Sequence, residues 1–326
     1  MKKSIPLILL VALSCQTKQT KESDQMNNPS ETQNLKAELF LKIEATLGEG
    51  PIWNYLTNEL YWIDIEGKKL HILDPKTKGN RTIPTPKLIG TVVPIDSTNV
   101  VVALEDGVYK LDIETEEFTP MVSIEEGNEK TRLNDGKCDP AGRFWIGSMD
   151  YNASEPIGNL YMVDGAGKSE LKLDSLIISN GIVWTADKKT MYHSETMTRT
   201  IRSFDYENET GVITNEITII NIPDTLGLPD GMAIDEEGMI WIGLWDGDGI
   251  VQYNPNSGEL LQKVDVPAHN VTACAFGGEN LDTLFITTSR NDMSEEEKAR
   301  YPDAGSVFAV VPGVKGVKSD FFKPTK

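Results

Sequence analysis

Six polar residues open six similar stretches of the chain, and three of them have side chains that could bind a metal ion. The six are Glu49, Thr91, Asn134, Asn180, Asp230 and Thr272, separated by steps of 42, 43, 46, 50 and 42 residues. Glu49 and Asp230 offer carboxylates and Asn180 offers an amide oxygen, and hard divalent cations such as Ca²⁺, Mg²⁺ or Mn²⁺ prefer such ligands. The alternative is a structural role, in which these side chains cap loops by accepting hydrogen bonds from backbone N–H groups.

A second group of polar residues stands shortly before the apolar run FWIGS. Arg132, Asn134 and Asp135 place a guanidinium, an amide and a carboxylate within four positions, and the turn residues 139–142 follow. This grouping indicates a ligand site at the start of a buried hairpin. Taken alone, it could equally be an ordinary polar loop, because short motifs often occur by chance.

The stretches that carry these residues share one plan. Each opening residue precedes a short apolar strand, a turn and a second apolar strand, and a further amphipathic strand follows, as in LHILD, VYKLD and LYMVD. Three to four strands per unit and a near-constant step are typical of radial β-repeats. The sequence therefore predicts an all-β, six-bladed β-propeller, and the single period disfavours a pair of β-sandwiches.

This fold makes predictions about particular segments. The first strand of each blade lines the central channel of a propeller, so we expect the six opening residues to meet around the axis at one end. The strand at 38–47 precedes the first repeat and is expected to join the last blade and close the ring. A short helix is predicted at 294–301, where Ser294 and Glu297 form a capping box.

Several segments of the chain resemble the signature segments of one known family. They read LGEGPIW, TRLNDGKCDPAGRFWIGSMD, ISNGIVW, LPDGMAIDEEGMIWIG, CAFGG and AGSVFAV. In this order and spacing they resemble the regucalcin/gluconolactonase family, also called the senescence marker protein family, over about residues 38–320. The resemblance implies a propeller that hydrolyses sugar lactones with one divalent metal ion in its channel, Ca²⁺ first and Mg²⁺, Mn²⁺ or Zn²⁺ as alternatives.

The same resemblance implies roles for individual residues. Glu49, Asn180 and Asp230 would hold the metal ion, which would polarise the ring carbonyl, and Asp230 would also act as general base toward the attacking water. Arg132 and Asn134 would hold the sugar hydroxyls. No nucleophile elbow occurs, so we expect no covalent acyl-enzyme. Two rival functions stay open: a phosphotriesterase of similar architecture, and a non-catalytic protein that binds calcium or sugar.

One departure from the family pattern affects the substrate site. Asn152 stands at the position where some members place a substrate-contacting glutamate. Asp150 and Glu155 lie close by in the sequence and are candidates to replace that glutamate. We therefore expect Arg132, Asn134 and Asn152 to contact the substrate, while the identity of the lactone stays open.

The N-terminal part of the chain differs in character from the rest. Residues 1–14 carry two lysines and an apolar run too short to span a bilayer, which predicts an export signal. The signal ends in ALSC, and a small residue before Cys15 resembles the bacterial lipoprotein cleavage box; an ordinary signal peptide is the alternative. Residues 15–37 are then a lipidated cysteine and a disordered tether, and residues 38–326 a single propeller domain. This predicts an exported protein, anchored to a membrane in the periplasm or at the cell surface.

Charge and cysteine content narrow the choice of partners. A net charge of −19 repels phosphate backbones, so we expect no nucleic-acid partner. Cys138 and Cys274 fall on opposite blades of a six-bladed ring, so we expect two buried free thiols rather than a disulfide. We expect a monomer whose partner is a small sugar lactone.

Replacing Cys15 by alanine tests the lipid anchor. The Cys15→Ala protein should leave the membrane fraction, because the acyl chains that would hold it are attached to that thiol. Cell fractionation measures the change, and mass spectrometry of the parent protein checks Cys15 for lipid. Unchanged fractionation, or a parent protein with unmodified Cys15, would contradict the prediction.

Overall fold

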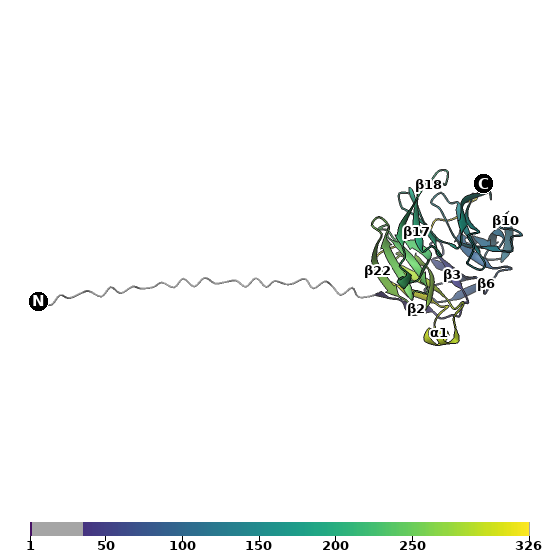
Figure 1. Ribbon diagram of the computed structural model, residues 1–326. Coiled ribbons are helices and arrows are strands. Elements are labelled where there is room, and N and C mark those ends of the chain that lie inside the picture. The colour runs from purple at the N-terminus through teal and green to yellow at the C-terminus, as the bar shows by residue number, and fades with distance from the viewer. Residues whose placement is uncertain (2–34, 326) are drawn as a thin grey trace. The chain divides into compact units, whose positions relative to one another are not determined.

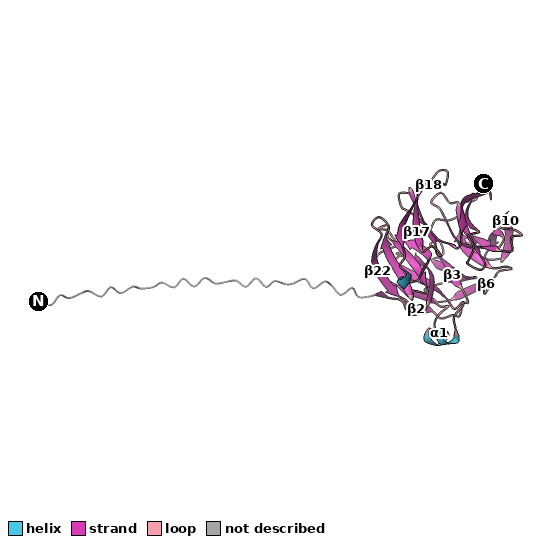
Figure 2. Ribbon diagram, viewed as in Figure 1, coloured by secondary structure: helices cyan, strands magenta, loops and turns pink. Residues whose placement is uncertain are grey.

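The computed structural model describes residue 1 and residues 35–325, and it shows the six-bladed β-propeller that the sequence predicts (Figure 1). Nearly all of the regular structure is strand (Figure 2). The helical elements in the described part are α1 (Glu295–Arg300) and the 3₁₀ turn η1 (Asp224–Leu226), and no helix there is long and apolar enough to cross a membrane. The predicted signal peptide, Cys15 and the tether up to residue 34 lie outside the described residues.

In each blade the strands pair antiparallel and follow one another from the channel outward, with blade 1 beginning at β3 and blade 6 at β23. The innermost strands are β3 (Gly48–Asn54), β7 (Ile89–Pro94), β11 (Thr131–Cys138), β15 (Ser179–Trp184), β19 (Leu228–Ile234) and β23 (Asn270–Gly277). The second strands are β4 (Glu59–Asp64), β8 (Asn99–Leu104), β12 (Phe144–Asp150), β16 (Thr190–Glu195), β20 (Ile240–Trp245) and β24 (Thr283–Ser289). The third strands are β5 (Lys69–Leu73), β9 (Gly107–Asp112), β13 (Gly158–Val163), β17 (Thr200–Glu207), β21 (Gly249–Asn254) and β25 (Val307–Val310). The outermost strands are β6 (Asn80–Pro84), β10 (Glu117–Ser123), β14 (Ser169–Leu176), β18 (Val212–Asn221), β22 (Glu259–Asp265) and β2 (Glu38–Leu41).

A strand from the N-terminal side closes the ring, as predicted, because β2 pairs antiparallel with β25 of blade 6. The strand ends at Leu41 rather than at residue 47. There the Ser306 hydroxyl takes over the backbone bonds of Ile43, accepting from its amide at 3.1 Å and donating to its carbonyl at 2.8 Å. The sequence did not predict β1 (Leu35–Lys36), which pairs in parallel with β22 of blade 5. Regular structure therefore begins inside the segment that was assigned to the tether.

Two local predictions are confirmed. The capping box at α1 is present, because Ser294 Oγ accepts from the Glu297 amide at 3.2 Å and Glu297 Oε2 accepts from the Ser294 amide at 2.7 Å. Cys138 and Cys274 are both buried and free. Neither thiol is reactive in this setting, since burial raises the pKa of each.

Two turns between first and second strands are held by an aspartate that binds a tryptophan six residues later. Asp139 accepts from the Arg143 amide at 2.9 Å through Oδ1 and from Trp145 Nε1 at 2.9 Å through Oδ2. Asp235 likewise accepts from Trp241 Nε1 at 2.8 Å. All of these side chains except that of Arg143 are buried. Part of the repeat signal in the sequence therefore reflects turn closure and core packing rather than ligand binding.

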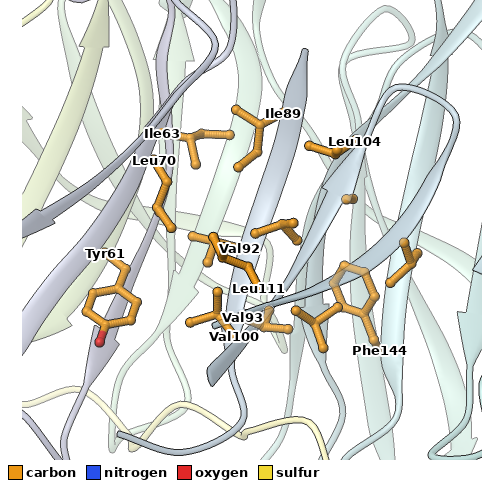
Figure 3. Close-up of a cluster of buried hydrophobic side chains, with 14 of the residues drawn as sticks. Tyr61, Ile63, Leu70, Ile89, Val92, Val93, Val100, Leu104, Leu111 and Phe144 are labelled. Atoms are coloured by element: carbon orange, nitrogen blue, oxygen red, sulfur yellow. The ribbon is translucent and has the colours of Figure 1, made fainter. Parts of the chain in front are cut away.

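Neighbouring blades pack through apolar side chains. One buried cluster joins blades 1, 2 and 3, and Figure 3 shows Ile63, Val92 and Phe144 from these blades within it. Each of the three is at most 1% exposed, and burying such a side chain stabilises the fold by about 1.5–3 kcal/mol. This packing fixes the positions of the innermost strands and so of the residues that line the channel.

The C-terminal segment after β25 crosses the end of the channel that lies away from the opening residues. Its backbone links blade 6 to blade 2, because the Gly316 amide donates to Leu281 O at 2.8 Å and the Phe322 amide donates to Pro94 O at 2.9 Å. Residues 317–320 line a cavity of about 80 Å³ together with the last residues of several innermost strands. The sequence analysis assigned no role to this segment.

Two aromatic rings anchor the segment. Phe321 stacks on Tyr55 with ring centroids 4.4 Å apart, and Phe322 is 1% exposed and belongs to the cluster of blades 1 to 3. The segment therefore covers one end of the channel as part of the core, and a ligand is expected to enter from the other end.

Removing the second of these rings tests the anchor. Phe322→Ala should lower the free energy of unfolding by about 3–5 kcal/mol, because it leaves a cavity in place of a fully buried ring. Urea unfolding measures the change. Val311, 63% exposed in the same segment, supplies the control, and Val311→Ala should change the free energy by about 0.5 kcal/mol or less. If Phe322→Ala behaved like the control, the ring would not hold the segment in place.

Candidate metal and substrate site

Every innermost strand is irregular at the residue that opens its repeat. The pairing with the second strand skips from Glu49 to Ile52 in β3, from Leu133 to Gly136 in β11 and from Pro229 to Met232 in β19. Shifts also occur in β7, β15 and β23. A bulge of this kind inserts an extra residue and redirects a side chain while the ladder continues. The repeated polar residues of the sequence are therefore bulge residues beside the channel.

Close approach of neighbouring backbones accompanies these bulges. A Cβ atom at Gly90 would lie 2.5 Å from the carbonyl oxygen of Asn134, and one at Gly181 would lie 2.7 Å from that of Asp230. Only glycine fits at such contacts without a shift of the backbone. Glycine at these two positions therefore allows neighbouring innermost strands to pack closely at the level of the site.

Four of the six opening residues line one cavity of about 300 Å³, namely Glu49, Asn134, Asn180 and Asp230, and Arg132 lines it with them. The expectation that all six meet there is wrong for the two threonines. Thr91 Oγ1 donates to Gly136 O at 3.1 Å, and Thr272 Oγ1 donates to Gly48 O at 2.6 Å. Each hydroxyl finds an acceptor in the innermost strand of the next blade, so it joins two blades instead of facing a ligand.

Two buried carboxyl groups, those of Glu49 and Asp230, face each other in this cavity. Their residues are 8% and 5% exposed. Burial raises the pKa of both groups, and the Glu49 charge raises that of Asp230 further. The buried Asp230 Oδ1 accepts no hydrogen bond from the described residues. Such crowding is unfavourable for two anions and favours a cation between them.

A chain of hydrogen bonds orients the amide of Asn180. Arg132 Nη1 donates to Asn134 Oδ1 at 2.7 Å, and Asn134 Nδ2 donates to Asn180 Oδ1 at 2.8 Å and to Ser179 O at 3.1 Å. Asn180 Nδ2 then donates to Thr196 Oγ1 at 2.8 Å. The chain leaves one lone pair of the Asn180 oxygen available. Asn134 uses both amide hydrogens within the protein, so it positions Asn180.

The donor set fits a hard divalent cation. Glu49, Asn180 and Asp230 supply two carboxylates and an amide oxygen to one cavity, and Asp230 Oδ1 has no other partner among residues 35–325. Loop capping accounts for Glu49 Oε2, which accepts from the Gly50 amide at 2.9 Å, and for the Gly231 amide beside the Asp230 carboxyl group. It leaves Asp230 Oδ1 without a partner among residues 35–325. The described residues contain no cluster of three or more His, Cys, Asp or Glu side chains able to hold a metal. The amide of Asn180 would therefore be an essential third ligand.

Asp150 is committed to its own loop. It accepts from the amides of Asn152 at 3.2 Å, Ser154 at 3.1 Å and Glu155 at 2.9 Å, and these donors lower its pKa to about 2. Asn152 and Glu155 are exposed, and neither lines the cavity. Their neighbours Tyr151 and Ala153 line it instead.

Acidic residues at the ends of other second strands also accept hydrogen bonds from backbone amides of nearby loops, as Asp150 does. Asp64 at the end of β4 accepts from the Leu47 and Gly67 amides, both at 3.0 Å. Glu195 at the end of β16 accepts from the Ile178 amide at 3.0 Å. A carboxylate at this position therefore fixes the loops at the rim of the cavity and is not available to a substrate.

Sequence reasoning missed the residues that form the rim. Apolar side chains come from blades 3, 4 and 5: Met149, Tyr151, Ile178, Met197, Leu228 and Trp245. Glu66 from blade 1 and Asp292 from blade 6 add acidic groups. Most of these residues lie at or just after the end of a second strand. Antiparallel pairing brings that end beside the start of the first strand, which is the signal that could have located them.

The fold and the site together define a propeller with an oxygen-lined pocket in its channel, and the sequence can be placed more closely. The SMP-30/Gluconolactonase/LRE-like region matches residues 47–290. The chain therefore belongs to this family, as the resemblance of its segments indicated.

Individual relatives agree with this assignment. YvrE of Bacillus subtilis, named as a candidate sugar lactone lactonase, is 34% identical over 84% of this chain and 94% of its own. Regucalcin of Danio rerio is 33% identical over 87% of this chain and 97% of its own. The solved structure of regucalcin from Agrobacterium tumefaciens, described as a calcium-binding protein, is 25% identical with a TM-score of 0.85 and covers 89% of this chain and 98% of its own.

Acid titration tests the role of Asp150. Its pKa is lowered from 3.8 to about 2, so the unfolded chain takes up the proton first as the pH falls. Asp150 therefore stabilises the fold above pH 3.8 and loses this contribution as the pH approaches about 2. Asp150→Asn should lower the thermal midpoint at neutral pH, and its difference from the parent should shrink through this window.

The exposed neighbour Glu155 provides the control for this experiment. Glu155→Gln removes the same charge from the same loop and should leave the thermal midpoint at neutral pH close to that of the parent, because the exposed Glu155 side chain accepts no hydrogen bond from the described residues. Thermal unfolding of the three proteins at a series of pH values gives the comparison. A difference between Asp150→Asn and the parent that did not change with pH would show that the carboxylate charge is not what caps the loop.

Proposed function

We propose that this protein is a divalent-metal-dependent hydrolase that opens sugar lactones. Membership of the SMP-30/Gluconolactonase/LRE-like family and the lactonase name of the Bacillus relative support this activity. The observation that carries the proposal is the buried Asp230 Oδ1, which has no partner within residues 35–325 and lies beside a second buried carboxyl group in a cavity that Arg132 also lines. The calcium-binding description of the Agrobacterium structure makes Ca²⁺ the first candidate, with Mg²⁺, Mn²⁺ or Zn²⁺ as alternatives.

Glu49, Asn180 and Asp230 would hold the ion. When bound, it supplies Lewis-acid polarisation to a carbonyl oxygen placed beside it. Residues of the chain would orient the metal ligands and hold the substrate. Asn134 keeps the Asn180 oxygen in place, and Arg132 has N–H groups left to hold a substrate oxygen, because only its Nη1 donates within residues 35–325, to Leu133 O and to Asn134 Oδ1.

Asp230 is the proposed general base. Its carboxylate would hold a water molecule near the lactone carbonyl and accept a proton as the water oxygen bonds to the carbonyl carbon. The ring C–O bond then breaks, and the leaving oxygen takes up a proton to give the open hydroxy acid.

Paired charge-neutralising variants separate the two roles of Asp230. Asp230→Asn keeps an oxygen that can bind metal but loses the base, so its turnover at saturating metal should be about 10²- to 10⁴-fold below that of the parent. Glu49→Gln makes the same charge change at a residue that only holds metal, so excess metal should restore most of its activity. Lactone hydrolysis during titration with Ca²⁺, Mn²⁺ and Zn²⁺, with calorimetry for metal affinity, measures both effects.

Three outcomes decide the proposal. Equal rescue of the two variants by metal would make Asp230 a ligand only and would place the base elsewhere. A parent protein that opens no lactone but hydrolyses an organophosphate triester would support the phosphotriesterase alternative. Sugar or calcium binding without any turnover would support a non-catalytic role.

A further inference from the structure

The cavity at the site has two unlike walls. At the rim, the side formed by blades 3, 4 and 5 is largely apolar and includes Tyr151, Met197 and Trp245, of which the first two are 43% and 41% exposed. The same three blades also line the cavity with the buried residues Arg132, Asn134, Asn180 and Asp230. The side formed by blades 1 and 6 carries Glu66, Asn291 and Asp292 beside two aliphatic residues. A ligand that fills the cavity therefore needs an apolar face toward the rim of blades 3 to 5, and hydrogen-bonding groups toward the acidic rim of blades 1 and 6 and toward the buried polar residues.

Glu66 is the rim carboxylate that is available to a ligand. Its side chain is exposed at the rim, and among residues 35–325 it accepts no hydrogen bond and forms no ion pair. Asp292, in contrast, accepts from Asn291 Nδ2 at 2.9 Å through Oδ2. Of the acidic residues at this rim, Glu66 is thus the one whose two oxygens are both without a protein partner.

The backbone that presents Glu66 is held in place. The Ile65 amide donates to Leu47 O at 2.9 Å, and the Lys68 amide donates to Ile65 O at 3.1 Å. Asp64 accepts from the Gly67 amide at 3.0 Å, on the other side of Glu66. A rigid turn reduces the entropy lost when the side chain binds a ligand.

Arg132 lines the same cavity and has N–H groups that are not used in hydrogen bonds within residues 35–325. The residue is 6% exposed, and its Nε and Nη2 groups donate to no atom of residues 35–325. Burial lowers the pKa of Arg132, and the negative charge of Glu66 opposes this shift, yet no ion pair joins Glu66 to Arg132 within the described part. The cavity of about 300 Å³ is therefore lined by both a carboxylate acceptor and a guanidinium donor that do not pair with each other within residues 35–325.

We propose that Glu66 is a specificity-determining residue, which accepts a hydrogen bond from a substrate hydroxyl while Arg132 donates to a neighbouring oxygen of the same substrate. A hydroxyl group both donates and accepts, so a pair of adjacent hydroxyls suits these two partners. The carbon face of the ring would rest on Tyr151 and Trp245. This inference rests on the proposed lactonase function and narrows its substrates to lactones that carry adjacent hydroxyl groups.

Two lactones of equal ring size test this role: glucono-1,5-lactone, which carries hydroxyls, and δ-valerolactone, which carries none. Glu66→Ala should raise KM for the hydroxylated lactone roughly 10- to 100-fold, the effect of losing a charged hydrogen bond. It should leave kcat for that lactone and KM for δ-valerolactone nearly unchanged. Glu66→Gln keeps an accepting oxygen and should fall between the parent and Glu66→Ala.

Glu155→Ala is the matched control, because it removes the same charge from an exposed rim loop outside the cavity. It should leave both KM values unchanged. An unchanged KM for the hydroxylated lactone in Glu66→Ala, or an equal rise for both lactones, would overturn the inference.

Direct binding separates this inference from the proposed activity. Calorimetry with gluconate, the open hydroxy acid, compares the metal-loaded parent protein with Glu66→Ala. If the parent opens no lactone, the proposed function fails, and weaker gluconate binding by Glu66→Ala would still support Glu66 as the hydroxyl-binding residue. Equal gluconate binding by the two proteins would overturn that role whatever the activity.

Discussion

Six innermost strands have to pack around one axis, and this constraint shapes everything at the site. Neighbouring backbones meet so closely that Gly90 and Gly181 have no room for a side chain. The strands tolerate this contact because each one carries a bulge at the same level, which redirects one polar side chain toward the channel or toward the next blade. Glu49, Asn180 and Asp230 converge for this reason, although they lie far apart in the sequence and belong to no shared local motif.

Aspartate carboxylates have two different roles in this protein, and the groups that surround each carboxylate decide which role it has. Backbone amides surround Asp150 and lower its pKa to about 2, so it is a stable cap for its loop. Burial and the negative charge of Glu49 raise the pKa of Asp230, and its Oδ1 has no hydrogen-bond donor among residues 35–325. The first arrangement stabilises the fold, and the second costs stability in a way that a bound cation would offset. Carboxylates at the ends of second strands therefore hold the loops at the rim, while those of Glu49 and Asp230 at the bulges face the cavity.

The sequence predicted the arrangement of the blades better than the residues at the rim of the cavity. The constant step, the alternating strands and the turn residues indicated six blades, and the strand before the first repeat indicated how the ring closes. The rim could not be predicted in this way, because Glu66, Met197 and Trp245 lie at or just after the ends of second strands and share no residue type or motif. The C-terminal segment was missed for a related reason: Phe321 and Phe322 give no periodic signal, and their partners belong to distant blades.

By itself the sequence determined the architecture and the candidate ligand set, because the period and the residue types at repeated positions are local properties that a single chain displays. Only the tertiary structure decided which of these polar residues are available to a ligand. It showed that Thr91 and Thr272 join blades and that Asn134 orients Asn180. It also showed that the Glu66 carboxylate lines the cavity with no partner in the part of the chain that the structure describes. Availability depends on which donors and acceptors surround a group in space, and these come from strands far apart in the sequence.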